Sequence, residues 1–352
     1  MSATQHQRLL DLGWTPELGR AFHPYRGAHR LARVCRIDRG AADLAGGMGA
    51  VRASYGGDML RAGAADRMAL PAVGDWAAVR DWPDDRVTLE AVLPRRTAIV
   101  RDSADRTSQG QVVAANVDVV AIVEHLDPDP DLGRIERLLV LAWGSGAQPV
   151  VVLTKPDLVP DPDGMRAEVA AVAPGVEILL VSAVSGTGVD ELGALLRNGR
   201  TLALVGPSGA GKSTLTNALL GVDVMPTGSV RARDGRGRHT TTHRELVVLP
   251  GRGVLIDTPG LRAVGLVADD DAVAGAFPDV EALAARCRFR DCTHEAEPGC
   301  AVRPAVEDGD LDEDRLARWR NLRREAARNA AHRTPGDRRA VVADLEARRH
   351  RR

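Results

Sequence analysis

Lysine is almost absent from this chain of 352 residues, since arginine supplies all but two of its 47 basic residues. The two lysines, Lys155 and Lys212, each lie inside a short motif rich in glycine, proline or hydroxyl residues. The planar guanidinium of arginine cannot replace a compact ammonium group at a phosphate, or a slim alkyl chain along a nucleobase. Both lysines are therefore candidate binding residues.

Aromatic residues, cysteines and long apolar segments are also scarce, and aromatic side chains make up only 3% of the chain. No apolar run approaches the ~18 residues that a membrane span needs, and the first residues lack the pattern of a signal peptide. Four cysteines, three of them within fourteen residues, do not resemble a secreted disulfide framework. We therefore expect a soluble, cytoplasmic protein with no membrane partner.

The net charge of −1 says little about partners, whereas the distribution of charge is informative. From Arg315 to the end of the chain there are 13 arginines and four acidic residues. This segment predicts a local basic patch. Its first part is expected to be a basic helix that carries Arg315, Arg318, Arg320, Arg323 and Arg324.

The pattern of apolar residues changes twice, which predicts three domains, at residues 1–100, 101–266 and 267–352. In the first, short apolar stretches separated by glycines alternate as in a small antiparallel β-barrel. In the second, near-continuous apolar strands alternate with helices, as in a parallel α/β sheet. The third holds most of the cysteines and a charged helix near 312–330. The expected strands are 31–37, 49–55, 73–79 and 87–93 in the barrel, and 117–123, 149–153, 176–181, 201–205 and 254–256 in the sheet.

A phosphate-binding loop follows the predicted strand at 201–205. The segment from Gly206 to Ser213 matches the pattern G-x-x-x-x-G-K-[ST] at every fixed position, and the helix after it ends at Gly221. Backbone N–H groups of the turn and the N-terminus of the helix would meet phosphate there. Lys212 is expected to bridge the β and γ phosphates, and the Ser213 hydroxyl to bind Mg²⁺.

The residues expected to recognise guanine lie upstream of this loop, whereas in an ordinary GTPase they lie downstream. In Thr154-Lys155-Pro156-Asp157 the last carboxylate can accept from guanine N1–H and the exocyclic amine, a donor pair that adenine lacks. Ser182 and Ala183 would add a backbone N–H to guanine O6. Thr154 replaces the usual asparagine and so removes the amide that normally ties this segment to the phosphate loop, which would lower the affinity for the nucleotide. The magnesium motif, Asp257 to Gly260, comes last, so the motif order is circularly permuted.

Hydrolysis by the chain alone is expected to be slow. Leu261 follows Gly260 where signalling GTPases carry a water-orienting glutamine nearby, and an apolar side chain cannot orient water. His239 is the best internal candidate, because imidazole can orient or deprotonate water. Contact with RNA is an equally good role for His239. Thr241, in the same segment, is expected to cap the Mg²⁺ and the γ-phosphate.

A cluster of metal-ligand residues, C-x₄-C-x-H-x₅-C, lies near the C-terminus and consists of Cys287, Cys292, His294 and Cys300. Three thiolates and one imidazole are enough for closed tetrahedral zinc, which would be structural. We therefore expect one structural Zn²⁺. Disulfide pairing is the alternative, disfavoured in a cytosolic chain.

Together these motifs resemble one family, the bacterial ribosome small-subunit-dependent GTPases (RsgA/YjeQ type). The permuted order, the run Ala114 to Val120, the segment Gly237 to Thr242 and the stretch Cys287 to His294 carry the resemblance, which runs from about Arg30 to Arg324. It implies an N-terminal RNA-binding OB-fold, a permuted GTPase domain and a mostly helical zinc domain. It also implies a GTP hydrolase stimulated by the small (30S) subunit during late maturation, with 16S rRNA as a partner. Nothing in the sequence suggests more than a monomer.

Matching positions imply nucleotide contacts from two motifs. These are Thr154, Lys155, Pro156, Asp157, Gly206, Pro207, Ser208, Gly209, Ala210, Gly211, Lys212, Ser213 and Thr214. Ser182 and Ala183 are added to them because they follow the predicted strand at 176–181. The chain departs from the family pattern in a glycine-rich insertion at 41–49 and in the few aromatics of its barrel, Tyr55, Trp76 and Trp82. Stacking of bases needs such rings, so we expect arginines to contact structured rRNA instead. The candidates are Arg30, Arg33, Arg36 and Arg39.

Other functions remain open at this point. An RNA-binding assembly factor could carry a structural nucleotide that it barely hydrolyses, which the apolar Leu261 allows. A GTP-driven metal chaperone is a second alternative, although a closed four-ligand site argues against metal transfer. An ATPase is disfavoured by Asp157.

Overall fold

A computed structural model describes residues 2–101, 110–221, 245–249, 251–258 and 269–332 of the chain. Two short helices, α1 (Ala3–Asp11) and α2 (Pro16–Ala21), and the turn η1 (His23–Tyr25) precede a closed five-stranded barrel. Its strands are β1 (Arg30–Asp38), β2 (Ala41–Gly46), β3 (Gly49–Tyr55), β4 (Trp76–Asp81) and β5 (Val87–Val92). Their order around the barrel is β1-β2-β3-β5-β4, and α3 (Gly57–Ala65) with η2 (Arg67–Ala69) connects β3 to β4.

The glycine-rich stretch at 41–49 is a regular part of this barrel. It forms β2 and the turn into β3, with Ala42 and Leu44 buried on the inner face. A Cβ on Gly46 would lie 2.8 Å from the carbonyl oxygen of Leu31, so glycine allows β1 and β2 to lie close together. The four other barrel strands were predicted. Trp76 of β4 is 1% exposed and packs outside the barrel core, in the apolar cluster that the N-terminal helices share with the sheet.

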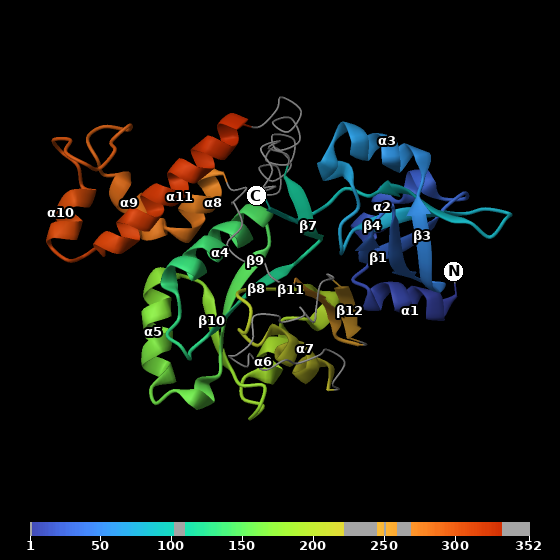
Figure 1. The fold of residues 1–352 in the computed structure, drawn as a ribbon, viewed down its shortest axis with the longest axis horizontal. Helices are drawn as coiled ribbons and strands as arrows, with labels where there is room; N and C mark the ends of the chain where they lie inside the picture. Colours follow the sequence, from blue (N-terminus) through green and yellow to red (C-terminus); the bar gives the residue numbers. More distant parts are fainter. Residues whose placement is uncertain (1, 102–109, 222–244, 250, 259–268, 333–352) are drawn as a thin grey trace, which may run out of the picture.

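A six-stranded sheet lies beside the barrel (Figure 1), in the order β10-β9-β8-β11-β13-β12. Five strands run parallel: β8 (Val119–His125), β9 (Gln148–Thr154), β10 (Glu177–Val181), β11 (Thr201–Val205) and β13 (Gly253–Asp257). The edge strand β12 (Glu245–Leu249), which was not predicted, pairs antiparallel with β13. A two-stranded ribbon, β6 (Ala98–Arg101) and β7 (Gln111–Ala115), leads into the sheet from the barrel.

Helices cover both faces of the sheet, as its continuous apolar strands predict. α4 (Leu132–Ser145) and α5 (Pro162–Val172) pack on one face. α6 (Val189–Ala194) and α7 (Lys212–Leu220) pack on the other. The short turns η3 (Pro156–Leu158) and η4 (Arg197–Gly199) follow β9 and α6.

The C-terminal part is helical and consists of α8 (Asp270–Ala276), α9 (Pro278–Ala284), α10 (Val302–Glu307) and α11 (Glu313–His332). The long helix α11, predicted near 312–330, crosses α8 and lies beside α4 (Figure 1). Its buried side chains Leu316, Trp319 and Leu322 belong to the same apolar core as α4. None of the described helices has the length and apolar character needed to cross a membrane.

Arg33 joins the barrel to the sheet, so its predicted contact with RNA was wrong. Its side chain is 1% exposed. The guanidinium donates to the carbonyl oxygens of Leu12, Gly74 and Asn116 and, at 2.9 Å, to the Thr201 hydroxyl at the start of β11. A charge with this many acceptors can stay buried, because each guanidinium nitrogen finds a partner.

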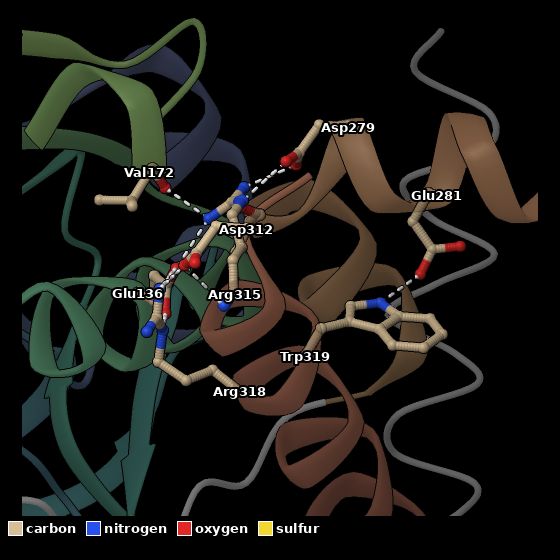
Figure 2. Close-up of polar contacts among 9 residues, drawn as sticks. Glu136, Val172, Asp279, Glu281, Asp312, Arg315, Arg318 and Trp319 are labelled. Carbon is tan, nitrogen blue, oxygen red and sulfur yellow. Dashed lines mark hydrogen bonds and ion pairs between the residues drawn. The ribbon is translucent and has the colours of Figure 1, made fainter. Parts of the chain in front are cut away.

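Arg315 is also buried, so its predicted place on an exposed basic surface was wrong. Figure 2 shows its guanidinium between Glu136 of α4 and Asp279 of α9. Its Nη1 lies 2.8 Å from Glu136 Oε1, and its Nη2 lies 2.6 Å from Asp279 Oδ1. The side chain of Arg315 is 4% exposed, that of Glu136 is 0% exposed and that of Asp279 is 37% exposed. Arg318 bonds to the other oxygen of Glu136. The start of α11 is therefore clamped to the sheet domain.

Candidate nucleotide and metal sites

The motifs that are far apart in the sequence meet at one edge of the sheet. Thr154, Ser182, Gly206 and Asp257 stand at or just after the ends of β9, β10, β11 and β13. Because these strands are parallel, their carboxyl ends share one edge. The chain order reverses between β8 and β11, and ligands of open α/β sheets bind at such a point.

The phosphate loop has the backbone that an anion cradle needs. Gly206 has a φ of 145°, and a Cβ there would lie 2.1 Å from the carbonyl oxygen of Val123. Gly209 and Gly211 also lie in the left-handed region, at φ 87° and 89°, and α7 begins directly after Gly211. The free N–H groups at the start of α7 therefore point toward the loop, where an anion would bind.

Lys212 and Asp257 are both buried at this edge and lie close enough for their charges to attract each other. Lys212 Nζ donates to the carbonyl oxygens of Gly206, at 2.9 Å, and Pro207, at 2.7 Å. Burial lowers the pKa of Lys212 and raises the pKa of Asp257, while the attraction between the two charges opposes both shifts.

The residues present fit a magnesium ion with its water shell. Asp257 Oδ1 is buried and has no hydrogen-bond partner among the described residues. A buried carboxylate oxygen without a donor is costly, and an ion-bound water would satisfy it. The Ser213 hydroxyl, on the first turn of α7, is partly accessible.

Thr154 still ties its segment to the phosphate loop, through its hydroxyl. Its hydroxyl lies 2.8 Å from the carbonyl oxygen of Ala210 in that loop and 3.2 Å from the carbonyl oxygen of Glu124. The side chain is 3% exposed, so water does not compete for this bond. A hydroxyl replaces the amide of asparagine as the donor.

The rest of the guanine motif is open to solvent. Lys155 adopts the left-handed conformation, with φ 61°, which turns the chain into η3. Asp157 is exposed within this turn. Ser182 is buried, and its hydroxyl accepts from the N–H of Ser185 at 3.2 Å, which shapes the loop that presents Ala183. These loops leave a carboxylate and backbone N–H groups for a ligand.

Glu124 was missed by the sequence analysis. Its side chain is 0% exposed at the end of β8, and Arg134 of α4 binds both carboxylate oxygens at 2.7 and 2.9 Å. A charged residue that closes an apolar strand is the signal that would have found it. β8 lies between β9 and β11, and the carbonyl oxygen of Glu124 accepts from the Thr154 hydroxyl at 3.2 Å. Four residues from the predicted site, His239, Thr241, Gly260 and Leu261, lie outside the described residues.

The cysteine cluster assembles as predicted. The ligand atoms of Cys287, Cys292, His294 and Cys300 all lie within 4.8 Å of one another, and all four cysteines of the chain are free thiols. His294 Nδ1 lies 3.5 Å from Cys287 Sγ and 3.6 Å from Cys300 Sγ, and the two sulfurs are 4.0 Å apart. Ligand atoms in tetrahedral zinc sites lie about 3.5–3.8 Å apart.

Burial lowers the pKa of His294, which favours the neutral imidazole that binds metal. The four ligands come from a segment with little regular structure between α9 and α10. The cluster can therefore hold a metal that organises this segment.

The chain's sheet order, phosphate loop and motif order define a circularly permuted GTPase. A family model described as RsgA GTPase matches residues 92–267. A protein of Streptomyces avermitilis named small ribosomal subunit biogenesis GTPase RsgA is 49% identical over 94% of this chain and 88% of its own length. A protein of the same name from Opitutus terrae is 48% identical over 91% of this chain and 90% of its own length. The chain therefore belongs to the RsgA GTPase family and is a GTP hydrolase.

Solved structures agree on the fold. The crystal structure of YjeQ from Thermotoga maritima superposes with a TM-score of 0.62 at 26% identity, covering 85% of this chain and 99% of that one. The structure of YloQ, titled a circularly permuted GTPase, gives a TM-score of 0.59 at 22% identity over 86% and 96%.

Proposed function

We propose that this GTPase binds the small (30S) ribosomal subunit and hydrolyses GTP to GDP and phosphate during late maturation of that subunit. The observation that carries the proposal is the meeting of three nucleotide motifs at one sheet edge, in a chain 49% identical to a small ribosomal subunit biogenesis GTPase. The proposed domains are 1–100, 101–266 and 267–352, acting as a cytoplasmic monomer.

In the proposed complex, Gly206 to Thr214 hold the phosphates. Lys212 would leave its two carbonyl partners to bridge the β and γ phosphates, Ser213 would hold Mg²⁺, and Asp257 would orient a water bound to it. When bound, Mg²⁺ would supply positive charge against the charge that develops on the phosphates. Since Asp257 Oδ1 has no partner among described residues, it is free for that role.

Guanine is held by the loops after β9 and β10. Asp157 accepts from N1–H and the exocyclic amine, Lys155 with Pro156 lies along the base, and Ser182 with Ala183 contacts O6. The exposed Asp157 carboxylate and the Thr154 tie to Ala210 support this role, because they keep the base and phosphate loops in a fixed relation.

Hydrolysis is proposed to be slow until the subunit supplies or orders a group. Thr241 is assigned to Mg²⁺ and the γ-phosphate, and His239 to the attacking water or to RNA. The second candidate function, a structural nucleotide in an RNA-binding factor, is favoured by the apolar Leu261.

Contact with 16S rRNA is proposed through the barrel and the cysteine-rich domain with its one structural zinc ion. The buried Arg33 and Arg315 are excluded from these contacts. Arg323, Arg324 and Arg328 are exposed on α11 and remain available, as does Arg39 in the barrel.

The test is GTP hydrolysis by the purified protein, alone and with isolated small subunits. We expect stimulation of about tenfold or more, lost in Lys212→Ala and absent with large subunits, since groups supplied to the transition state can contribute ~10³ or more. Turnover that small subunits leave unchanged would remove them as the activator and favour the structural nucleotide.

A further inference from the structure

A hollow of about 490 Å³ lies where the N-terminal helices meet, and it shares no residue with the nucleotide-binding loops. Its volume is within the range of roughly 300–1,000 Å³ found for small-ligand sites. The residues that line it are Trp14, Pro16, Gly19, Arg20, His23, Pro24 and Arg26.

The wall of the hollow is flat and apolar. The Trp14 indole lies against α2, where a Cβ on Gly19 would be only 3.0 Å from Trp14 Cζ2. Glycine at this place lets the helix approach the ring, and the indole stays partly accessible. The rings of Pro16 and Pro24 add to the apolar lining.

The rim of the hollow is cationic. Arg20, His23 and Arg26 are exposed. Arg20 faces Glu17 at 4.0 Å, but both side chains are mostly exposed, at 75% and 66%, so this pair contributes little. Within the described part of the chain, the side chains of His23 and Arg26 make no hydrogen bond, ion pair or ring contact. No acidic residue lines the hollow.

The segments that form the hollow are fixed to the core of the protein. Leu9, Leu12 and Leu18 are 3–4% exposed and join the main core. The carbonyl oxygen of Leu12 accepts from the buried guanidinium of Arg33, which also binds Thr201 of the sheet. The site therefore needs no folding step to receive a ligand, and binding is not weakened by an ordering cost.

We propose that this hollow binds one unpaired RNA nucleotide, with its base stacked on Trp14 and its phosphates among Arg20, His23 and Arg26. Any base can stack on a flat apolar wall, and a cationic rim neutralises the charge of the flanking phosphates. Recognition of a particular base would need buried amides or carboxylates that hydrogen-bond to the edge of the base. The proposal rests on the RNA partner of the proposed function, but not on GTP hydrolysis. It places base stacking beside the N-terminal helices, outside the barrel, where Trp76 is buried and cannot stack a base.

The test uses the full chain with GDP and Mg²⁺ and a ten-nucleotide oligouridylate containing 5-iodouridine. Affinity is measured over a range of salt concentrations for wild type, Arg20→Gln/Arg26→Gln and the matched control Arg61→Gln/Arg67→Gln. The control removes the same charge from exposed positions on α3 and η2. Irradiation followed by mass spectrometry then maps the crosslinked peptide.

We expect the pocket variant to bind about tenfold more weakly and the slope of log affinity against log salt to fall by ~1.4, for two phosphates. The control variant should lose less than about threefold, and the crosslink should fall on the peptide with Trp14. Trp14→Phe, which keeps a ring, should retain most of the affinity, whereas Trp14→Ala should not.

Equal losses in the two double variants, or crosslinks confined to other peptides, would overturn the proposal. So would displacement of the RNA by a phosphoserine peptide of equal charge, because the site would then recognise phosphate on protein. Subunit-stimulated GTP hydrolysis is measured on the same proteins. Its absence in wild type would refute the proposed function, while a crosslink at Trp14 would still establish the site.

Discussion

The clamp between α11 and α4 yields a prediction that depends on burial rather than on charge alone. Arg315 makes hydrogen bonds to Glu136, Asp279 and the carbonyl oxygens of Val172 and Ala276. Arg315→Met removes all of them and leaves Glu136, 0% exposed, with Arg318 as its remaining partner. Breaking a buried ion pair in this way costs about 3–5 kcal/mol.

Removing both charges should cost less than removing one. In Glu136→Leu/Arg315→Met no uncompensated charge stays fully buried, because Asp279 and Arg318 are 37% and 27% exposed and can be hydrated. Apolar replacements of buried pairs are often neutral or stabilising. We therefore expect the double variant to be more stable at this interface than Arg315→Met by about 2 kcal/mol or more.

The assay is native-state hydrogen exchange of the α11 amides in the zinc-loaded protein, which gives the free energy of opening of this helix. Arg324→Met, exposed on the same helix, is the control and should change it by less than ~0.5 kcal/mol. A cost below about 1 kcal/mol for Arg315→Met would refute the reasoning. So would a double variant whose loss of stability equals the sum of the losses in Glu136→Leu and Arg315→Met.

Three further predictions concern the two sites. Thr154→Val should weaken GDP binding about fivefold, because the lost hydrogen bond costs ~1 kcal/mol, whereas Thr154→Asn should not weaken it. Equal affinity of wild type and both variants for GDP in calorimetry would contradict this. Asp257→Asn should raise the unfolding midpoint of the nucleotide-free protein at pH 8 while abolishing Mg²⁺-dependent turnover. Burial holds the pKa of Asp257 above its value in the unfolded chain, so ionising the folded protein costs stability at a pH above the folded pKa and costs none below the unfolded pKa. The stability gained by Asp257→Asn should therefore shrink as the pH falls. A gain that grows as the pH falls would contradict the raised pKa. Purified protein should hold about one zinc per chain, and Cys287→Ser or chelation should remove it. Its removal should change the fluorescence of Trp319, because that ring lies 5.4 Å from the His294 ring. An unchanged metal content would exclude the site.

Local chemistry made the strand, loop and helix of the phosphate-loop motif predictable. A phosphate loop needs glycines at fixed places and one lysine, and its neighbours in sequence supply the strand and helix that shape it. The motif Thr154 to Asp157 was identified from its residue types and its role toward guanine stays a prediction, but the hydrogen bond made by Thr154 was not expected. Its hydroxyl partner, Ala210, lies in another motif, and only the packing of β9 near β11 brings them together.

The sequence by itself determined the permuted motif order, the parallel sheet and the four-ligand cluster, because each depends on residues that act within a short stretch or a simple period. Tertiary structure alone decided which arginines are surface and which are structural. Arg33 and Arg315 look like their neighbours in the sequence, yet both are buried among acceptors supplied by distant segments. Whether a charge can be buried depends on what packs around it, and that is a property of the whole fold.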